Sequence, residues 1–325
     1  MKLSVFTLSK SDFNPRSGCF FEHDLNQNDE DFFKENLRVI KETFNFLCEA
    51  LKGLKKQDTV LRKSIHLEKR VAIAFFTLGS CAEYRTIANL FDVGKSTVLD
   101  ILFAFCEEVI KVCKVEYMDA YLTESSINET IKAFEAIGLM NCCGSVDGCH
   151  IEISPPADQA SDYHNYKGWY SMLTTDTVLL TRTSERLGAL TTLNYLNHQF
   201  ILAKFNDRSI DIGNETAFKL QVNLMKPYPF GLERSEKKAR FRRIGKGLES
   251  TIDHSCLIIQ AASILHNVLN INNDLINQRW VEEFEKFNTR AQPEPQFTPF
   301  DRNGEATIIR DALANYLYEK RHSNN

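Results

Sequence analysis

Apolar residues recur every three to four positions between about residues 29 and 136, which is the spacing of amphipathic helices. This pattern predicts four helices, over residues 29–50, 67–78, 82–91 and 95–113. Residues 1–28 lack a sustained pattern, and we expect them to be loosely ordered. A helical domain is therefore predicted over residues 29–138.

The pattern changes after Gly138, where glycine and turn residues become frequent together with the β-branched residues Thr, Val and Ile. Residues 141–147 and 149–153 predict two short strands, and Asp147-Gly148 between them is a pair that favours tight hairpin turns. Further strands are predicted within residues 169–180 and 187–204. Strands should therefore begin only after Gly138.

The C-terminal part of the sequence returns to helical patterns. Residues 256–269 are apolar nearly all round, which is typical of a helix buried between layers. A proline-rich linker at residues 292–300 precedes an amphipathic helix at residues 305–321. The expected fold class is α+β, with a mixed domain over residues 139–285 and a linker with a C-terminal helix over residues 286–325.

Composition narrows the class of protein. The 325 residues are 43% hydrophobic and 25% charged, as in ordinary globular domains, which excludes disordered and fibrous classes. A net charge of −4 excludes nucleic-acid binding through bulk positive charge, although a local patch remains compatible with it. The nine cysteines are odd in number and irregularly spaced, which favours buried free thiols in a reducing compartment. No apolar stretch is long enough to span a bilayer, so we expect a soluble intracellular protein.

The two predicted helices at residues 82–91 and 95–113 are separated only by Asp92-Val93-Gly94. Two helices joined by a short glycine-containing turn form the helix-turn-helix pattern, whose second helix reaches base edges with its N-terminal residues. An ordinary helical hairpin explains the pattern equally well. The candidate DNA contacts are Lys95, Ser96 and Thr97.

A basic run lies between Leu232 and Glu249, with seven Lys or Arg residues and three Glu. Phe241 and Ile244 supply an apolar stripe, so the cations should occupy one side of a helix. A solvated helix face and a phosphate-contact surface both fit this pattern. The candidate contacts are Lys237, Lys238, Arg240, Arg242 and Arg243.

Asp147 is a carboxylate at the end of an apolar strand, which is costly to bury unless it is paired or binds a cation. A metal-binding carboxylate and an exposed turn residue are equally compatible with the local sequence. The neighbouring Cys142, Cys143, Cys149 and His150 do not have the spacing of a structural zinc site, and core thiols are favoured.

Several ordered blocks resemble the Harbinger transposases and the nucleases derived from them. The signature-like blocks are 144–153, Pro155-Pro156 and 162–171, with a helix-turn-helix block at 82–98. Three more similar blocks follow at 226–229, 239–247 and 262–267. The resemblance covers roughly residues 60–285.

This resemblance implies a helical N-terminal region with a helix-turn-helix, followed by a ribonuclease-H-like domain. It also implies metal-dependent phosphodiester cleavage by two Asp and one Glu, which hold Mg²⁺ or Mn²⁺. Asp147 matches the first Asp and Asp207 the second. The position of the third acid corresponds to Gly231; Glu233 and Glu236 lie close to it, and Glu233 is the candidate. The segment between residues 174 and 236 also looks shorter than in the family, so the domain is expected to be incomplete.

The function expected from the resemblance is that of a transposase-derived, divalent-metal-dependent nuclease that acts on DNA in the nucleus. The family also implies a separate DNA-binding partner protein, and no membrane is involved. The alternatives are a non-catalytic DNA- or protein-binding nuclear factor and a gene remnant that does not fold stably. Because the third acid is unmatched, we expect weak metal binding and no robust cleavage.

Overall fold

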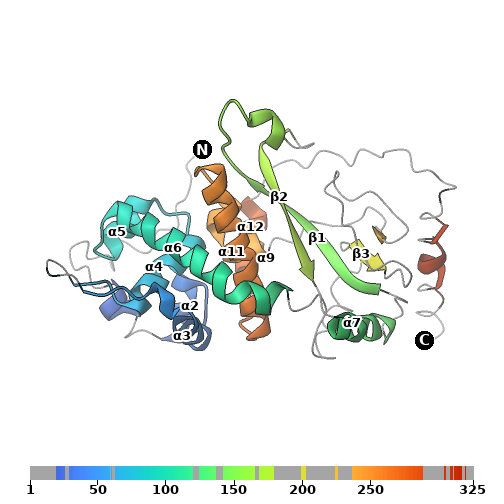
Figure 1. The fold of residues 1–325 in the computed structure, drawn as a ribbon, viewed down its shortest axis with the longest axis horizontal. Coiled ribbons are helices and arrows are strands. Elements are labelled where there is room, and N and C mark those ends of the chain that lie inside the picture. Colours follow the sequence, from blue (N-terminus) through green and yellow to red (C-terminus); the bar gives the residue numbers. More distant parts are fainter. Residues whose placement is uncertain are drawn as a thin grey trace. The chain divides into compact units, whose positions relative to one another are not determined.

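The structure is a computed structural model (Figure 1). In it the chain forms two compact units. One unit comprises residues 1–114 and 236–284, and the other comprises residues 115–235 and 285–325. The residues that the structure describes are 20–25, 29–58, 60, 63–119, 124–136, 142–164, 168–178, 199–202, 224–225, 236–287 and parts of 304–319. For residues 143–149 and 173–178 this description covers the backbone and its pairing.

The first unit is helical in its described residues. Its helices are α2 (Glu30–Leu37), α3 (Lys41–Ala50), α4 (Leu67–Gly79), α5 (Tyr84–Leu90), α6 (Lys95–Lys114), α9 (Glu236–Arg240), α10 (Arg242–Lys246), α11 (Ile252–Ile271) and α12 (Gln278–Phe287), with short turns η1 (Phe20–Asp24) and η2 (Lys52–Leu54). The predicted helices at 67–78, 82–91 and 95–113 are confirmed within a few residues, and α11 contains the predicted buried helix at 256–269.

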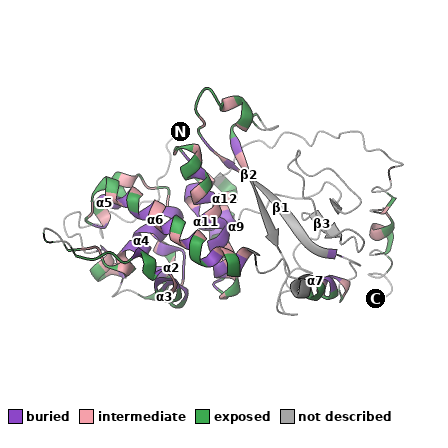
Figure 2. Cartoon of the chain, viewed as in Figure 1, coloured by how far each residue is buried: buried purple, intermediate pink, exposed green. Residues whose placement is uncertain are grey.

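Helix α4 forms the centre of this unit and is buried along most of its length (Figure 2). Its Phe75 side chain contacts Phe44 of α3 and Phe105 of α6, with ring centroids 6.4 and 5.4 Å apart. The next residue of α4, Phe76, packs edge-on against Phe91. These edge contacts between rings account for the phenylalanine-rich composition, because aromatic pairs fill a helical core with favourable geometry.

Residues 236–284 belong to the helical unit, whereas the sequence pattern predicted them as part of the mixed domain at 139–285. Helix α11 packs against α6, and α10 packs against α4. The nearly uniform apolar surface of α11 therefore packs against α6, a helix from the N-terminal part of the sequence. The periodicity of a buried helix reveals that it is covered, but not which layer covers it.

One predicted helix, over residues 29–50, is divided into α2 and α3. Arg38 ends α2 in the left-handed conformation, with a φ of 62°. Its guanidinium lies over the ring of Trp280, 4.1 Å from the centroid, and the next helix begins after Ile40. The prediction of a single helix was wrong because these contacts to a distant part of the chain outweigh the local periodicity.

A buried carboxylate joins three parts of the helical unit. Asp274, in the connection between α11 and α12, is fully buried, and its Oδ2 accepts a hydrogen bond of 2.8 Å from the backbone N–H of Ile40. Its Oδ1 lies 3.5 Å from Nη1 of Arg240, also fully buried, and 3.5 Å from Nζ of Lys34. Arg240 also donates from Nη2 to the backbone carbonyl of Asp274. This cluster, Asp274 with Arg240, Lys34 and Ile40, connects α9, the α2–α3 junction and the start of α12.

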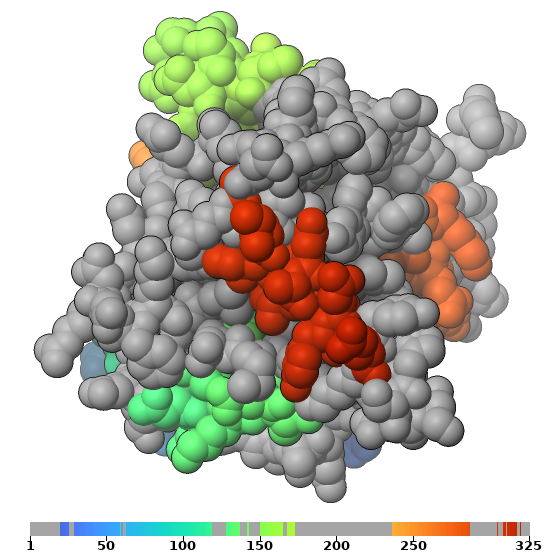
Figure 3. All heavy atoms as spheres, turned by 90° about the vertical axis from the view of Figure 1, so that its right-hand side faces the viewer, coloured from blue at the N-terminus to red at the C-terminus, as the bar shows by residue number. Residues whose placement is uncertain are grey.

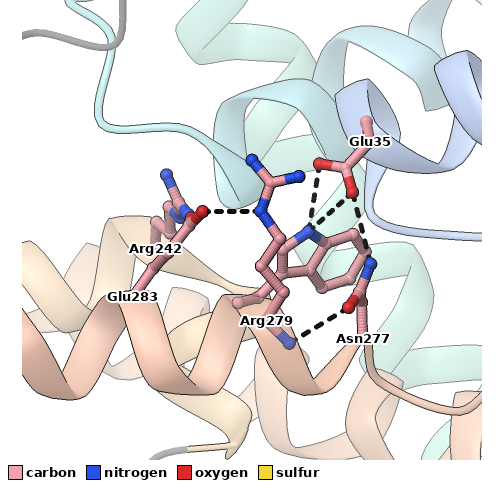
Figure 4. A network of polar contacts seen from close by, with 6 residues as sticks. Glu35, Arg242, Asn277, Arg279 and Glu283 are labelled. Carbon is pink, nitrogen blue, oxygen red and sulfur yellow. Dashed lines mark hydrogen bonds and ion pairs between the residues drawn. The ribbon is translucent and has the colours of Figure 1, made fainter.

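A second polar network fastens α12 to its neighbours (Figure 4). The indole N–H of Trp280 donates to Glu35 of α2 at 3.0 Å. On the next turn, Glu283 accepts hydrogen bonds from Arg242 at 2.8 Å and from Arg279 at 2.9 Å. Burial alone would raise the pKa of Glu283, but these two arginines outweigh it and hold the pKa below its ordinary value.

The second unit contains one antiparallel sheet of four strands in its described residues. The strands are β1 (Cys142–Glu152), β2 (Ser171–Val178), β3 (Gln199–Leu202) and β4 (Leu224–Met225), in the order β2-β1-β3-β4. Helix α7 (Glu124–Ala136) contacts β1, and a short turn, η3 (Val115–Asp119), precedes it. The first described strand begins at Cys142, after Gly138 as predicted, and the described elements are compatible with the α+β class. The predicted linker at 292–300 lies outside the described residues, and residues 311–316 near the C-terminus are helical.

Strand β1 corrects the prediction of two strands joined by a turn. It runs without a turn from Cys142 to Glu152, and Asp147 and Gly148 lie in its middle, paired with β2. An Asp-Gly pair favours a hairpin only when its two flanks pair with each other. Here both flanks pair with β2 and the first also with β3, so long-range pairing decides the conformation.

Replacing the buried carboxylate should strongly destabilise the helical unit. Asp274→Asn keeps the shape of the side chain but leaves Arg240 as an uncompensated buried cation, which costs about 3 kcal/mol. The free energy of unfolding, measured by urea denaturation, should fall by this amount. Glu249→Gln, at an exposed position between α10 and α11, is the control and should change stability by less than about 0.5 kcal/mol. Equal stability of the two variants would show that the buried pair is dispensable.

The network around Glu283 predicts a specific loss of stability in acid. Because the folded-state pKa lies below the ordinary value of 4.5, the carboxylate stabilises the fold above that pH, and the contribution disappears as the pH falls through the folded-state pKa. Thermal melts should show Glu283→Gln less stable than wild type at pH 6, with a difference that shrinks below pH 4.5. Glu282→Gln, on the exposed side of the same helix, should leave the pH profile of the wild type unchanged.

Candidate functional site

Of the three predicted metal ligands, the structure describes only Asp147. Asp207 and Glu233 lie outside the described residues, so their placement relative to Asp147 stays a prediction. Asp147 itself lies in the interior of β1, between two partner strands over part of its length. In the register with β2, Asp147 stands opposite Asp176, and Gly148 stands opposite Thr175.

This register places two acidic residues on directly opposed positions of neighbouring strands. Residues opposite each other in an antiparallel pair project to the same face, and like charges at such positions repel. By the alternation along a strand, Asp147 belongs to the face that carries Ile151 and Ile153, both of which are buried. Two acidic residues at directly opposed positions are a place where a bound cation would relieve the repulsion. Sequence reasoning missed Asp176, because assigning residues 147–148 to a turn concealed the register that identifies it.

Three positions after Asp147 along β1, and on the opposite face by the alternation of a strand, His150 joins the two strands. Its Nδ1 lies 2.9 Å from the Oγ of Ser171 at the start of β2, and its ring meets the edge of Trp169 at a centroid distance of 6.0 Å. Most of the described residues 154–164 of the β1–β2 connection are exposed, and this part lies at the surface (Figure 3). His150, Trp169 and Ser171 belong to the transposase-like blocks, and in this structure they hold the two strands together where the connection begins. Among the described residues, no group of three or more His, Cys, Asp or Glu is arranged to hold a metal ion.

The candidate helix-turn-helix is a pair of helices, α5 and α6, joined by residues 91–94. The turn reverses at Asp92, which has a φ of 50°, rather than at Gly94. Phe91 is fully buried, with its ring 5.3 Å from that of Phe20, and it fixes the turn against the core. Lys95 and Ser96, on the first turn of α6, are exposed, and Thr97 is half-buried.

The basic run at residues 232–249 is used largely inside the helical unit. Lys237 is buried and donates to the hydroxyl of Ser263 at 3.1 Å, and Arg240 is fully buried beside Asp274. Arg243 is buried as well, and donates to the backbone carbonyls of Thr77 at 3.1 Å and Ala82 at 2.6 Å. Its guanidinium also lies over the ring of Tyr84, 4.7 Å from the centroid. Arg243 therefore clamps the connection between α4 and α5.

This burial revises the interpretation of the run as a helix face covered with solvent-facing cations. Arg242 is part-buried and paired with Glu283, so its charge is compensated within the unit. Lys238 is half-buried, and Lys246 is the exposed cation among the described residues of the run. Helices α9 and α10 are only five residues each, and they are embedded among α4, α11 and α12. Amphipathic helices this short cannot separate a core face from a charged face when they are covered on several sides.

Four of the six described cysteines are buried free thiols. Cys48, Cys81, Cys106, Cys113, Cys142 and Cys256 are free, and Cys81 and Cys256 alone among these six are exposed. Burial raises the pKa of Cys48 to about 12, which keeps this thiol protonated and unreactive. In the described part of the chain, no helix has the length and apolar character that crossing a membrane requires.

Comparison with known proteins finds relatives over part of the chain. It is 33% identical over 146 residues to the Arabidopsis thaliana protein Antagonist of Like Heterochromatin Protein 1, covering 41% of this chain and 35% of that protein. It is 28% identical over 140 residues to the Arabidopsis thaliana protein ALP1-like, covering 40% of this chain and 32% of the relative. The chain thus spans about a third of the length of the curated relatives it matches. No known family profile and no solved structure matches it significantly. The two relatives support a transposase-derived origin for this chain.

Proposed function

We propose that this chain is a transposase-derived nuclear protein that binds DNA and carries a divalent-metal site for phosphodiester cleavage on β1. The observation that carries the proposal is the register of β1 and β2, which sets Asp147 opposite Asp176. Asp147 is also the residue that matches the first acid of the Harbinger-type signature. The expected nuclease fold is ribonuclease-H-like, of which the four described strands would form part.

The residues available on these strands suit Mg²⁺ or Mn²⁺. Both ions prefer hard oxygen ligands such as carboxylates, and two opposed aspartates supply them at one place on the sheet. Asp207 and, more weakly supported, Glu233 are proposed to complete the site. When bound, such an ion would activate water and stabilise the leaving oxygen of the phosphodiester. The aspartates themselves would hold the ion through their carboxylate oxygens.

DNA would be engaged by the first turn of α6. Lys95 and Ser96 are exposed there, and Thr97 lies beside them, so the turn offers one cation and two hydroxyls. Arg243 supports this role indirectly, because it fixes the connection that leads into α5. A separate DNA-binding partner protein would supply further sequence selectivity.

A second candidate function is that of a non-catalytic DNA- or protein-binding nuclear factor. Two observations favour it. Gly231 stands where the family's third acid is expected, and the first relative is named for antagonism of a heterochromatin protein. A chain that kept the fold and lost an acid would retain DNA or chromatin binding without cleavage.

Metal binding at β1 should be visible as thermal stabilisation. Adding 10 mM Mg²⁺ or Mn²⁺ should raise the melting temperature by about 2 °C, since the folded state alone binds the ion. Asp147→Asn and Asp176→Asn should each remove most of this shift and cost little stability without metal, because each relieves a like-charge repulsion. Asp162→Asn, in the exposed β1–β2 connection, is the matched control and should keep the full shift. A shift that survives Asp147→Asn would place the ion elsewhere.

Cleavage distinguishes the two candidate functions. A supercoiled plasmid incubated with the full chain and Mn²⁺ should be nicked slowly if the chain is a nuclease, and Asp147→Asn should abolish the nicking. Because the third acid is unmatched, we expect turnover well below that of an intact nuclease. Metal-dependent stabilisation with no nicking, together with DNA binding in a gel-shift assay, would identify the non-catalytic factor instead.

A further inference from the structure

Exposed positive charge is concentrated in the connection between α3 and α4. Residues 51–66, the basic loop, contain five Lys or Arg residues and one acid in a chain whose net charge is −4. The side chains of Lys52, Lys55, Lys56 and Lys63 are all exposed. Within the described residues, no acid pairs with Lys55, Lys56 or Lys63, and Lys52 makes a solvent-exposed pair with Glu49. Exposed pairs of this kind are weak and exchange readily for other anions.

The basic loop is built into the fold rather than being an extension of it. Leu51 and Leu54 are buried, and they anchor its first turn, η2, in the core. Asp58 closes the loop, because its Oδ1 accepts hydrogen bonds from the backbone N–H and the hydroxyl of Ser64 at 2.8 and 2.9 Å. Asp58, the single acid of the loop, is thus hydrogen-bonded within the loop. The exposed lysines lie on a loop whose two sides are joined by this contact.

Both ends of the basic loop lead into elements that pack against α6, the helix that carries the candidate DNA contacts. At its first turn, η2, Gly53 lies directly against the carboxylate of Glu108. At the other end the loop leads into α4, which also packs against α6. The basic loop therefore begins and ends beside elements that are held on α6.

We infer that the basic loop is a phosphate-contact surface, which holds the DNA backbone on the helical unit that carries α6. This inference rests on the proposed DNA binding and assigns its main electrostatic contact to residues 51–66 instead of the buried run at 237–243. Four exposed lysines on one loop are enough to neutralise several phosphates and release their counterions. Val60, at the loop tip, is fully exposed and leaves the approach to a large partner open.

Neutralising the loop tests the inference. The loop variant carries Lys52→Gln, Lys55→Gln, Lys56→Gln and Lys63→Gln, and the control variant carries Lys111→Gln, Lys132→Gln, Lys246→Gln and Lys286→Gln, which are exposed lysines elsewhere. Binding of the full chain to a fluorescent 20-base-pair duplex is measured by anisotropy between 50 and 200 mM salt. The loop variant should bind at least about tenfold more weakly at 100 mM salt, and its salt slope should fall by about 3 units. The control variant should match the wild type. Val60→Asp, which adds a negative charge at the tip without touching the core, should also weaken binding.

The outcomes separate this inference from the function on which it depends. A wild type that fails to bind the duplex at 50 mM salt would overturn the proposed DNA binding. A wild type that binds, with a loop variant of equal affinity and equal salt slope, would overturn the inference alone. Vesicles containing one third phosphatidylserine provide the last arm. Loop-dependent binding to vesicles with loop-independent binding to DNA would reassign the surface to an anionic membrane.

Discussion

The buried pair of Arg240 and Asp274 is the constraint on which the helical unit depends. Two fully buried charges 3.5 Å apart cannot be separated without leaving one of them uncompensated in the core. Because Asp274 also accepts the backbone N–H of Ile40, the same carboxylate determines where α2 ends and α3 begins. Segments more than 200 residues apart in the sequence are therefore held in one arrangement by a single side chain. Helix α12 begins directly after the connection in which Asp274 lies, so its start is held in the same arrangement.

The distribution of charge follows from the same packing. The chain places the cations of residues 237–243 inside the helical unit, where Arg243 braces the α4–α5 connection and Arg242 is paired with Glu283. Four exposed lysines lie together on a different segment, the basic loop at residues 51–66. A run of cations in a sequence can therefore either pair with groups inside the fold or form an exposed charged surface, and burial decides which of the two occurs. In this chain the buried run supports the helix pair, and the exposed loop is the surface available to an anionic partner.

The proposed metal site depends on the continuity of β1. If residues 147–148 formed a turn, Asp147 would be an isolated exposed acid with no partner strand on which to find a second carboxylate. As a continuous strand, β1 brings Asp147 opposite Asp176 through its pairing with β2. The electrostatic cost of two opposed acids is then the physical reason for a cation, and the same cost explains why removing one of them should be tolerated in metal-free buffer.

Much of the helical architecture could be predicted from local periodicity. The helices at 67–78, 82–91, 95–113 and 256–269 and the onset of strands after Gly138 are encoded in the spacing of apolar side chains, since a helix buries the face that its own sequence marks. The tertiary structure decided what that spacing does not contain. It broke the helix at Arg38, joined residues 142–152 into one strand, selected Asp176 as the neighbour of Asp147 and buried Lys237, Arg240 and Arg243. Each of these depends on a contact between residues distant in the sequence, and such contacts leave no mark in the periodicity of either partner.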